Sequence, residues 1–247
     1  MCQDCLKADG ARLARRSFLK LAATAAATAA GGLAVSAPAL AAKAKAPPKP
    51  QNVLKPDAAL ERLMKGNSRY VEGVSKRHDF KHEREPLRTG QNPFAGILSC
   101  ADSRIAPEYC FDTARGDLFV CRVAGNFAND DIVASFEYAV SVLNVPLVMV
   151  LGHDACGAVD ATMKSVKDGT TLPGHLPALV AAIAPAVKAA QGESGDALAN
   201  AIRRNVMLNV EKLKNAAPIL NAAAGDKKLR VVGGIYRLAT GQVELVG

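Results

Sequence analysis

The chain has 247 residues, of which 49% are hydrophobic, and its formal net charge is +8 at pH 7. This length is sufficient for one sizeable buried core, and six cysteines are too few for a disulfide scaffold. The positive charge is modest and forms no dense basic stripe with interleaved aromatic residues, which argues against nucleic acid as a partner.

The N-terminal segment carries the pattern of an export signal. The sequence RRSFLK at residues 15–20 precedes an alanine-rich apolar run from Leu21 to Leu40, and Ala39 and Ala41 suit a cleavage site. The pattern resembles a twin-arginine (Tat) signal peptide, which the Tat export machinery recognises. We therefore expect residues 1–41 to be removed and the protein to reach the bacterial periplasm without a stable membrane anchor. A retained transmembrane anchor is the alternative.

The mature chain begins with a segment of different composition. Residues 42–56 are rich in proline and lysine and predict an extended linker. A single domain over residues 57–247 follows. Its first helix is expected from Ala58 to Val71, because Leu60, Leu63 and Met64 recur at helical spacing, with Asp57 as N-cap.

Strands and helices then alternate along the domain. The expected strands are near-continuous apolar runs, Phe94–Ser99, Asp117–Val123, Pro146–Leu151 and Leu229–Tyr236, with a short last strand Gln242–Val246. The expected helices are Ile132–Leu143, capped by Asp130-Asp131, then Leu176–Ala190, interrupted by Pro185, and Asp196–Asn215. This order predicts an α/β fold with a mostly parallel central sheet flanked by helices.

Two short motifs follow two of these strands. The sequence SCADSR occupies residues 99–104, and GHDACG occupies residues 152–157. Because ligands bind at the carboxyl ends of strands in an open α/β sheet, we expect both motifs to contribute to one site there. Four other side chains that could bind a metal show no such motif. His78, His82 and His175 are expected in solvated segments, and Cys121 is expected to be a small core residue.

The residue types in the two motifs predict a catalytic zinc site with one ion per chain. Cys100, His153 and Cys156 supply thiolate and imidazole ligands, a borderline-soft set that suits zinc. Asp102 either occupies the fourth position or is drawn away from it by Arg104, whose guanidinium can hold a carboxylate through two hydrogen bonds. The open position would admit water, whose pKa zinc lowers to about 7.

Together the motifs resemble those of the β-class carbonic anhydrases. The similarity extends from about Asp57 to Gly247 and includes RVAGN at residues 122–126 and EYAV at residues 137–140. The resemblance implies reversible hydration of carbon dioxide to bicarbonate and a proton. It also implies a homodimer or tetramer, because substrate-contacting residues in this family come from the neighbouring subunit.

The same resemblance assigns residues to substrate binding. Gln91 aligns with the glutamine that hydrogen-bonds substrate, and Phe119 and Tyr138 fall at positions of the aromatic pocket. Ala124 stands where some members have valine, which implies a slightly wider pocket. Independently of the resemblance, Gly157 can offer a backbone N–H to an oxyanion, since it directly follows Cys156.

Two other functions share this ligand set. One is hydrolysis of carbon disulfide or carbonyl sulfide on a related fold with a changed access channel. The other is a non-catalytic zinc- or bicarbonate-binding module, against which the Asp102–Arg104 pair argues, because a purely structural site gains nothing from a releasable fourth ligand. Whether Cys110 and Cys121 pair in an oxidising compartment stays open; a disulfide is disfavoured, because nothing in the sequence fixes the separation that it requires.

Overall fold

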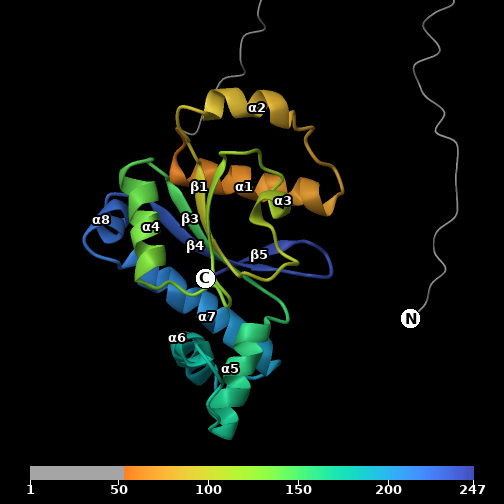
Figure 1. Ribbon diagram of the computed structural model, residues 1–247, viewed down its shortest axis with the longest axis vertical. Coiled ribbons are helices and arrows are strands. Elements are labelled where there is room, and N and C mark those ends of the chain that lie inside the picture. Colours follow the sequence, from red (N-terminus) through yellow and green to blue (C-terminus); the bar gives the residue numbers. More distant parts are fainter. Residues whose placement is uncertain (1–52) are drawn as a thin grey trace, which may run out of the picture. The chain divides into compact units, whose positions relative to one another are not determined.

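The computed structural model describes residues 53–247. The expected signal peptide and most of the expected linker therefore lie outside the described residues. A five-stranded sheet with the order β2-β1-β3-β4-β5 crosses the described part (Figure 1). Its strands are β1 Ala95–Ser99, β2 Leu118–Arg122, β3 Leu147–His153, β4 Arg230–Tyr236 and β5 Val243–Val246.

The sheet is mostly parallel, as predicted. Strand β1 pairs in parallel with both β2 and β3, and β3 pairs in parallel with β4. Only β5 is antiparallel, because it returns from β4 through a short turn at residues 238–240. The register places Ser99 beside Leu151 and His153 beside Tyr236, so β1, β3 and β4 end at the same edge of the sheet.

Helices cover both faces of the sheet (Figure 1). They are α1 Pro56–Val71, α2 Phe80–Leu87, α3 Pro107–Cys110, α4 Asp130–Ser141, α5 Gly157–Asp168, α6 Leu176–Ala189, α7 Ala197–Lys214 and α8 Ile219–Gly225. Helices α1 and α3 pack on one face, and α4 and α7 pack on the other, with α8 against both of them. Helices α5 and α6 pack against each other and against α7.

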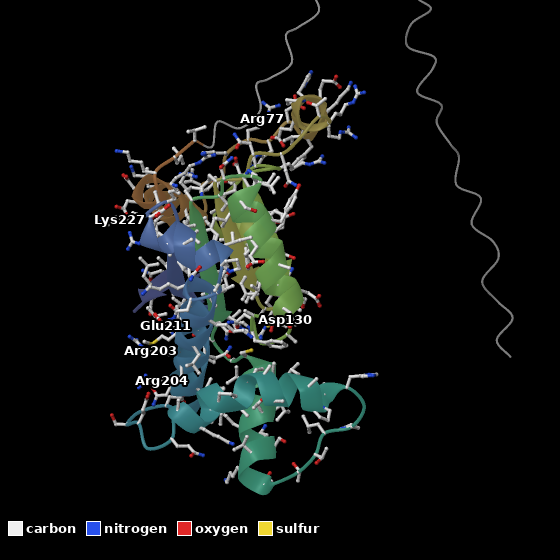
Figure 2. All side chains as sticks on the ribbon, turned by 90° about the vertical axis from the view of Figure 1, so that its left-hand side faces the viewer. Arg77, Asp130, Arg203, Arg204, Glu211 and Lys227 are labelled. Atoms are coloured by element: carbon white, nitrogen blue, oxygen red, sulfur yellow. The ribbon has the colours of Figure 1, made fainter. Side chains whose placement is uncertain are left out.

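Strand β3 divides the interior into two cores. Val148 and Val150 point into the core that α4 and α7 cover, whereas Leu147, Met149 and Leu151 point into the core beneath α1. All of β3 is consequently buried, which explains its unbroken apolar sequence. Charged side chains such as Asp130, Glu211 and Lys227 lie on the outside (Figure 2). The strand that carries His153 is therefore held on both faces.

Three helix details differ from the sequence prediction. Lys55 is the N-cap of α1, and Asp57 lies in the first turn, since Pro56 already takes the first helical position that suits its fixed φ. The side chain of Asn129 caps α4 by accepting from the backbone N–H of Ile132, so Asp130 and Asp131 occupy its first turn.

The third difference is Pro185, which lies inside α6 without ending it. A proline removes one backbone hydrogen bond, but the helix continues because Ile183, Ala186 and Val187 on either side remain buried.

The four cysteines of the described part are free. Cys110 belongs to the core beneath α1, whereas Cys121 packs against the core on the opposite face of the sheet. The sheet therefore separates the two thiols, which argues against a disulfide between them. No helix within residues 53–247 is long and apolar enough to cross a membrane.

Candidate metal centre

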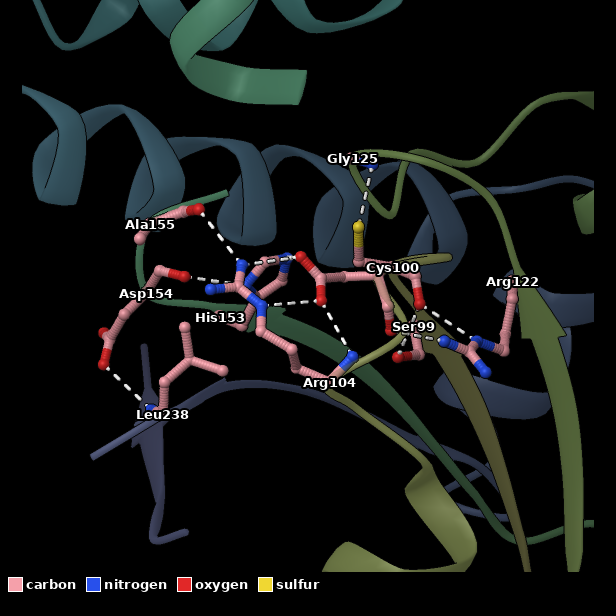
Figure 3. A network of polar contacts seen from close by, with 10 residues as sticks. Ser99, Cys100, Arg104, Arg122, Gly125, His153, Asp154, Ala155 and Leu238 are labelled. Atoms are coloured by element: carbon pink, nitrogen blue, oxygen red, sulfur yellow. Dashed lines mark hydrogen bonds and ion pairs between the residues drawn. The ribbon is translucent and has the colours of Figure 1, made fainter. Parts of the chain in front are cut away.

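Three metal-ligating side chains converge at the carboxyl edge of the sheet. Cys100 directly follows β1 and His153 is the last residue of β3 (Figure 3), and Cys156 is the N-cap of α5. Their ligand atoms all lie within 4.8 Å of one another, and the three residues are at most 4% exposed. The prediction that both motifs contribute to one site is thus met in the geometry, because β1 and β3 are adjacent parallel strands.

The histidine is oriented to offer one ring nitrogen to a metal. His153 Nδ1 is 2.7 Å from the backbone oxygen of Asp154 and donates its proton there. His153 Nε2 is buried and has no hydrogen-bond partner among the described residues. A buried polar atom without a partner is costly, and a metal ion beside the two sulfurs would satisfy it. The donor set therefore fits a zinc ion.

The two thiols differ in their electrostatics. The hydrogen bond from the Cys156 thiol, together with the neighbouring His153 ring, holds the pKa of Cys100 well below its usual value, against the effect of burial. The backbone N–H of Gly125 also donates to Cys100 Sγ at 3.3 Å. The pKa of Cys156 is raised, because its proton is held by the Cys100 sulfur and because it is buried. Because a metal ion binds both sulfurs as thiolates, metal binding would release the thiol protons that remain.

Asp102 is held by Arg104 at the rim of the cluster. Arg104 Nε donates to Asp102 Oδ1 at 2.9 Å, Nη2 donates to Oδ2 at 2.7 Å, and the backbone N–H adds a bond of 2.9 Å to Oδ1. The side-chain hydrogen bonds from Arg104 hold the pKa of Asp102 far below its usual range. Asp102 Oδ2 remains 3.9 Å from His153 Nε2, so the carboxylate stays charged and close to the cluster.

A second arginine, which sequence reasoning did not single out, secures the same loop. Arg122 Nε donates to the backbone oxygen of Cys100 at 3.0 Å, and Nη2 donates to that of Asp102 at 2.8 Å (Figure 3). The sequence signal that could have identified Arg122 is its position at the end of an expected strand, in the RVAGN segment. Arg122 thereby fixes the backbone that carries Cys100 and Asp102.

Helix α7 supports the opposite side of the site. Asn205 Nδ2 donates to the backbone oxygen of Gly125 at 2.8 Å, and Asn209 Oδ1 accepts from the backbone N–H of Ala128 at 2.7 Å. Gly125 itself has a φ of +81°, and a Cβ there would lie 2.4 Å from Ile183 Cδ1. Only glycine fits this close approach without displacement, which places its N–H against the Cys100 sulfur.

The residues assigned to substrate binding do not all lie near the metal cluster of their own chain. Gly157 is the exposed first residue of α5, next to Cys156. Phe119 on β2 packs against Tyr138 on α4, with ring centroids 6.4 Å apart, and Ala124 precedes Gly125. Gln91 is exposed in the segment before β1, at the end of that strand opposite to Cys100. A single chain therefore does not bring Gln91 to its own metal cluster.

The remaining histidines of the described part take no place in the cluster. His78 Nδ1 lies 3.3 Å from Glu83 Oε1, and His82 pairs with Asp79 near the start of α2. His175 is exposed ahead of α6. Within residues 53–247, Cys100, His153 and Cys156 are the one group of three or more candidate ligands that come together.

Comparison with known proteins agrees with this fold. A protein family described as "Carbonic anhydrase" matches residues 95–243. Carbonic anhydrase 2 of Mycobacterium tuberculosis is 38% identical over 191 residues, which cover 77% of this chain and 92% of that protein.

Solved structures show the same likeness. The β-carbonic anhydrase CcaA superposes with a TM-score of 0.60 at 27% identity, covering 77% of this chain and 92% of that one. One of two tetrameric β-carbonic anhydrases from Sordaria macrospora gives 0.61 at 22% identity, covering 77% of this chain and 98% of that one. The chain belongs to the carbonic anhydrase family, in its β class.

Proposed function

We propose that this carbonic anhydrase converts carbon dioxide and water reversibly to bicarbonate and a proton, with one zinc ion per chain held by Cys100, His153 and Cys156. The observation that carries the proposal is the unpartnered, buried His153 Nε2 facing two cysteine sulfurs. When bound, zinc would act as a Lewis acid that activates a water molecule at neutral pH.

The surrounding residues would orient the reactants. Arg104 holds both carboxylate oxygens of Asp102, so Asp102 is kept as a fixed, charged hydrogen-bond acceptor beside the cluster. This hold also keeps Asp102 from serving as a fourth ligand, which leaves room for water. The N–H of Gly157, at the start of α5, is available to an oxygen of the substrate, where the helix N-terminus favours negative charge.

We infer further that the active unit is at least a homodimer, and either a dimer or a tetramer. Gln91 lies at the wrong end of β1 to reach the cluster of its own chain, so its proposed contact with substrate requires a second copy. Helix α2 buries none of its residues, and Phe80 on α2 is 59% exposed. A second copy would cover the exposed Phe80 ring, and Phe119, Ala124 and Tyr138 would line the substrate pocket.

The location that we propose is the bacterial periplasm. It rests on the resemblance of residues 1–41 to a Tat signal peptide, which lies outside the described residues. Export of a folded protein would allow the site to be loaded with metal in the cytoplasm, where thiols stay reduced.

A stopped-flow assay of the zinc-loaded protein tests the activity. Hydration of carbon dioxide, with about one zinc per chain, is the expected result. Turnover of carbon disulfide or carbonyl sulfide without hydration of carbon dioxide would instead establish a hydrolase. Zinc binding without turnover of any of these substrates would establish a non-catalytic module. The variant Arg230→Ala is a suitable control, because Arg230 pairs with exposed Asp57 at the amino end of β4, away from the cluster.

A further inference from the structure

The two residues between the second and third metal ligands are held in an unusual way. Asp154 and Ala155 join His153 to Cys156, and Ala155 has a φ of +49°, in the left-handed region that alanine seldom adopts. This conformation persists only if the surroundings enforce it. The short connection therefore needs an anchor beyond its own backbone preferences.

Asp154 supplies that anchor through four atoms. Its backbone N–H donates to the oxygen of Tyr236 at 3.2 Å, and its own backbone oxygen accepts the Nδ1 proton of His153. Its Oδ1 accepts from Arg237 Nη1 at 2.8 Å, and its Oδ2 accepts from the backbone N–H of Leu238 at 3.2 Å. Figure 3 shows Asp154 between His153 and Leu238. The carboxylate thus ties the metal-bearing loop to the hairpin of β4 and β5.

The hairpin end of this link is itself fixed. Arg237 Nη2 donates to Glu244 Oε2 on β5 at 2.5 Å, so one guanidinium is shared by two carboxylates. The hydrogen bonds that Arg237 donates to Glu244 and Asp154 raise its pKa above its already high value, so the guanidinium stays charged.

We propose that Asp154, held by Arg237 and Glu244, is a positioning residue for the metal ligand His153. The carbonyl of Asp154 decides which ring nitrogen of His153 carries the proton and which way the ring faces. The carboxylate of Asp154 decides where that carbonyl points. This proposal deepens the proposed function and rests on its assignment of zinc to the cluster.

A purely stabilising role does not account for the arrangement. The side chains of Asp154 and Arg237 are 32% and 35% exposed, and that of Glu244 is 46% exposed. Ion pairs this accessible to solvent contribute little to folding. The same contacts are valuable where they set the direction of a ligand, because metal affinity depends on donor geometry.

The test compares zinc affinity, by chelator competition, in the parent and in Asp154→Ala, Arg237→Ala and the double variant. Each single variant should bind zinc about 10- to 100-fold more weakly, as with other residues that orient a ligating histidine. The double variant should bind zinc no more than about twofold more weakly than the weaker-binding single variant, since both changes break the same Asp154–Arg237 link. Arg237→Lys, which keeps the charge with fewer donors, should fall between parent and Arg237→Ala.

Two further readouts separate positioning from stability. The visible spectrum of the cobalt-substituted protein should change in Asp154→Ala and stay unchanged in Arg230→Ala. The latter is the matched loss of an exposed arginine at the opposite, amino end of β4. The unfolding midpoint of the metal-free protein should move by no more than about 3 °C in either variant. The proposal would be overturned if Asp154→Ala kept the zinc affinity and the cobalt spectrum of the parent. It would also be overturned if the losses of zinc affinity in the two single variants multiplied in the double variant. Failure of the parent to bind zinc would refute the proposed function instead.

Discussion

Replacement of Arg104 by alanine tests the role of the Asp102–Arg104 pair most directly. The change removes two of the three hydrogen bonds between these residues and leaves only the backbone N–H of residue 104 on Asp102 Oδ1. Asp102 Oδ2 then loses its 2.7 Å partner but remains 3.9 Å from His153 Nε2. A small rotation would bring the free carboxylate onto a metal bound by His153.

We expect Arg104→Ala to retain zinc and to lose activity at least about a hundredfold, the order seen when one preorganised donor is removed from an active site. Zinc content is measured on the purified protein, and carbon dioxide hydration by stopped flow. A crystal structure of the variant should show Asp102 as a fourth ligand. Arg104→Lys keeps the charge but cannot form two parallel hydrogen bonds, so its activity should be intermediate.

Two outcomes would contradict this reasoning. Retained zinc with near-normal activity would mean that Arg104 does not control Asp102. Loss of zinc would mean that Arg104 mainly holds the loop together, a role for which its 3.5 Å contact with the backbone oxygen of Ala155 gives a basis. Arg230→Ala should leave both quantities unchanged.

Four further predictions concern the ligands, the packing, the acid stability and the export of the protein. Cys156→Ala should lose both zinc and activity, and a full zinc complement by metal analysis would remove the proposed site. Gly125→Ala should lower the free energy of unfolding by roughly 2–4 kcal/mol, because residue 125 has a positive φ and the new Cβ would meet Ile183. Gly169 also has a positive φ, +63°, but a Cβ there would meet open space, so Gly169→Ala should lower this free energy by only about 1–2 kcal/mol in the same urea titration. Equal losses in the two variants would reject the packing argument. Burial raises the pKa of Asp112, but hydrogen bonds from Arg69 and from the Lys76 backbone outweigh this effect, so the pKa is lowered. The charged carboxylate therefore stabilises the folded protein above the unfolded pKa of about 3.9, and this stabilisation is lost as the pH falls through the folded pKa. Unfolding curves should show a steeper decline of stability in acid for the parent than for Asp112→Asn. Arg16→Lys should sharply impair export and leave activity in the cytoplasm intact, and unchanged periplasmic activity in cell fractions would show that the signal was misinterpreted.

Residue patterns along the chain were sufficient to predict most of the sheet. The expected strands β1, β2, β3 and β4 each end within two residues of the observed strands, because buried parallel strands are apolar on both faces and need no partner to be recognised. Helices α2, α3, α5 and α8 were not predicted. Helix α2 is charged and buries no residue, α3 spans only residues 107–110, and α5 starts at a glycine without a side-chain cap.

The metal cluster was predictable for a related physical reason. Cys100 and His153 stand at the ends of two apolar runs, and parallel strands that are neighbours in a sheet necessarily bring such ends together. Cys156 is only three positions after His153, so it lies at the same edge of the sheet. The pairing of Asp102 with Arg104 is also local, because the two residues are two positions apart.

Tertiary structure alone decided which residues hold these ligands in place. Arg122 reaches Cys100 across 22 positions, and Arg237 reaches Asp154 across 83. No local pattern specifies such partners, since a charged residue at a strand end is equally suited to solvent until the fold brings a carbonyl or carboxylate beside it. The sequence by itself determined the candidate ligands and the sheet edge that gathers them. The orientation of Cys100 and His153 depends on contacts that exist only after β2 has paired with β1 and β4 has paired with β3.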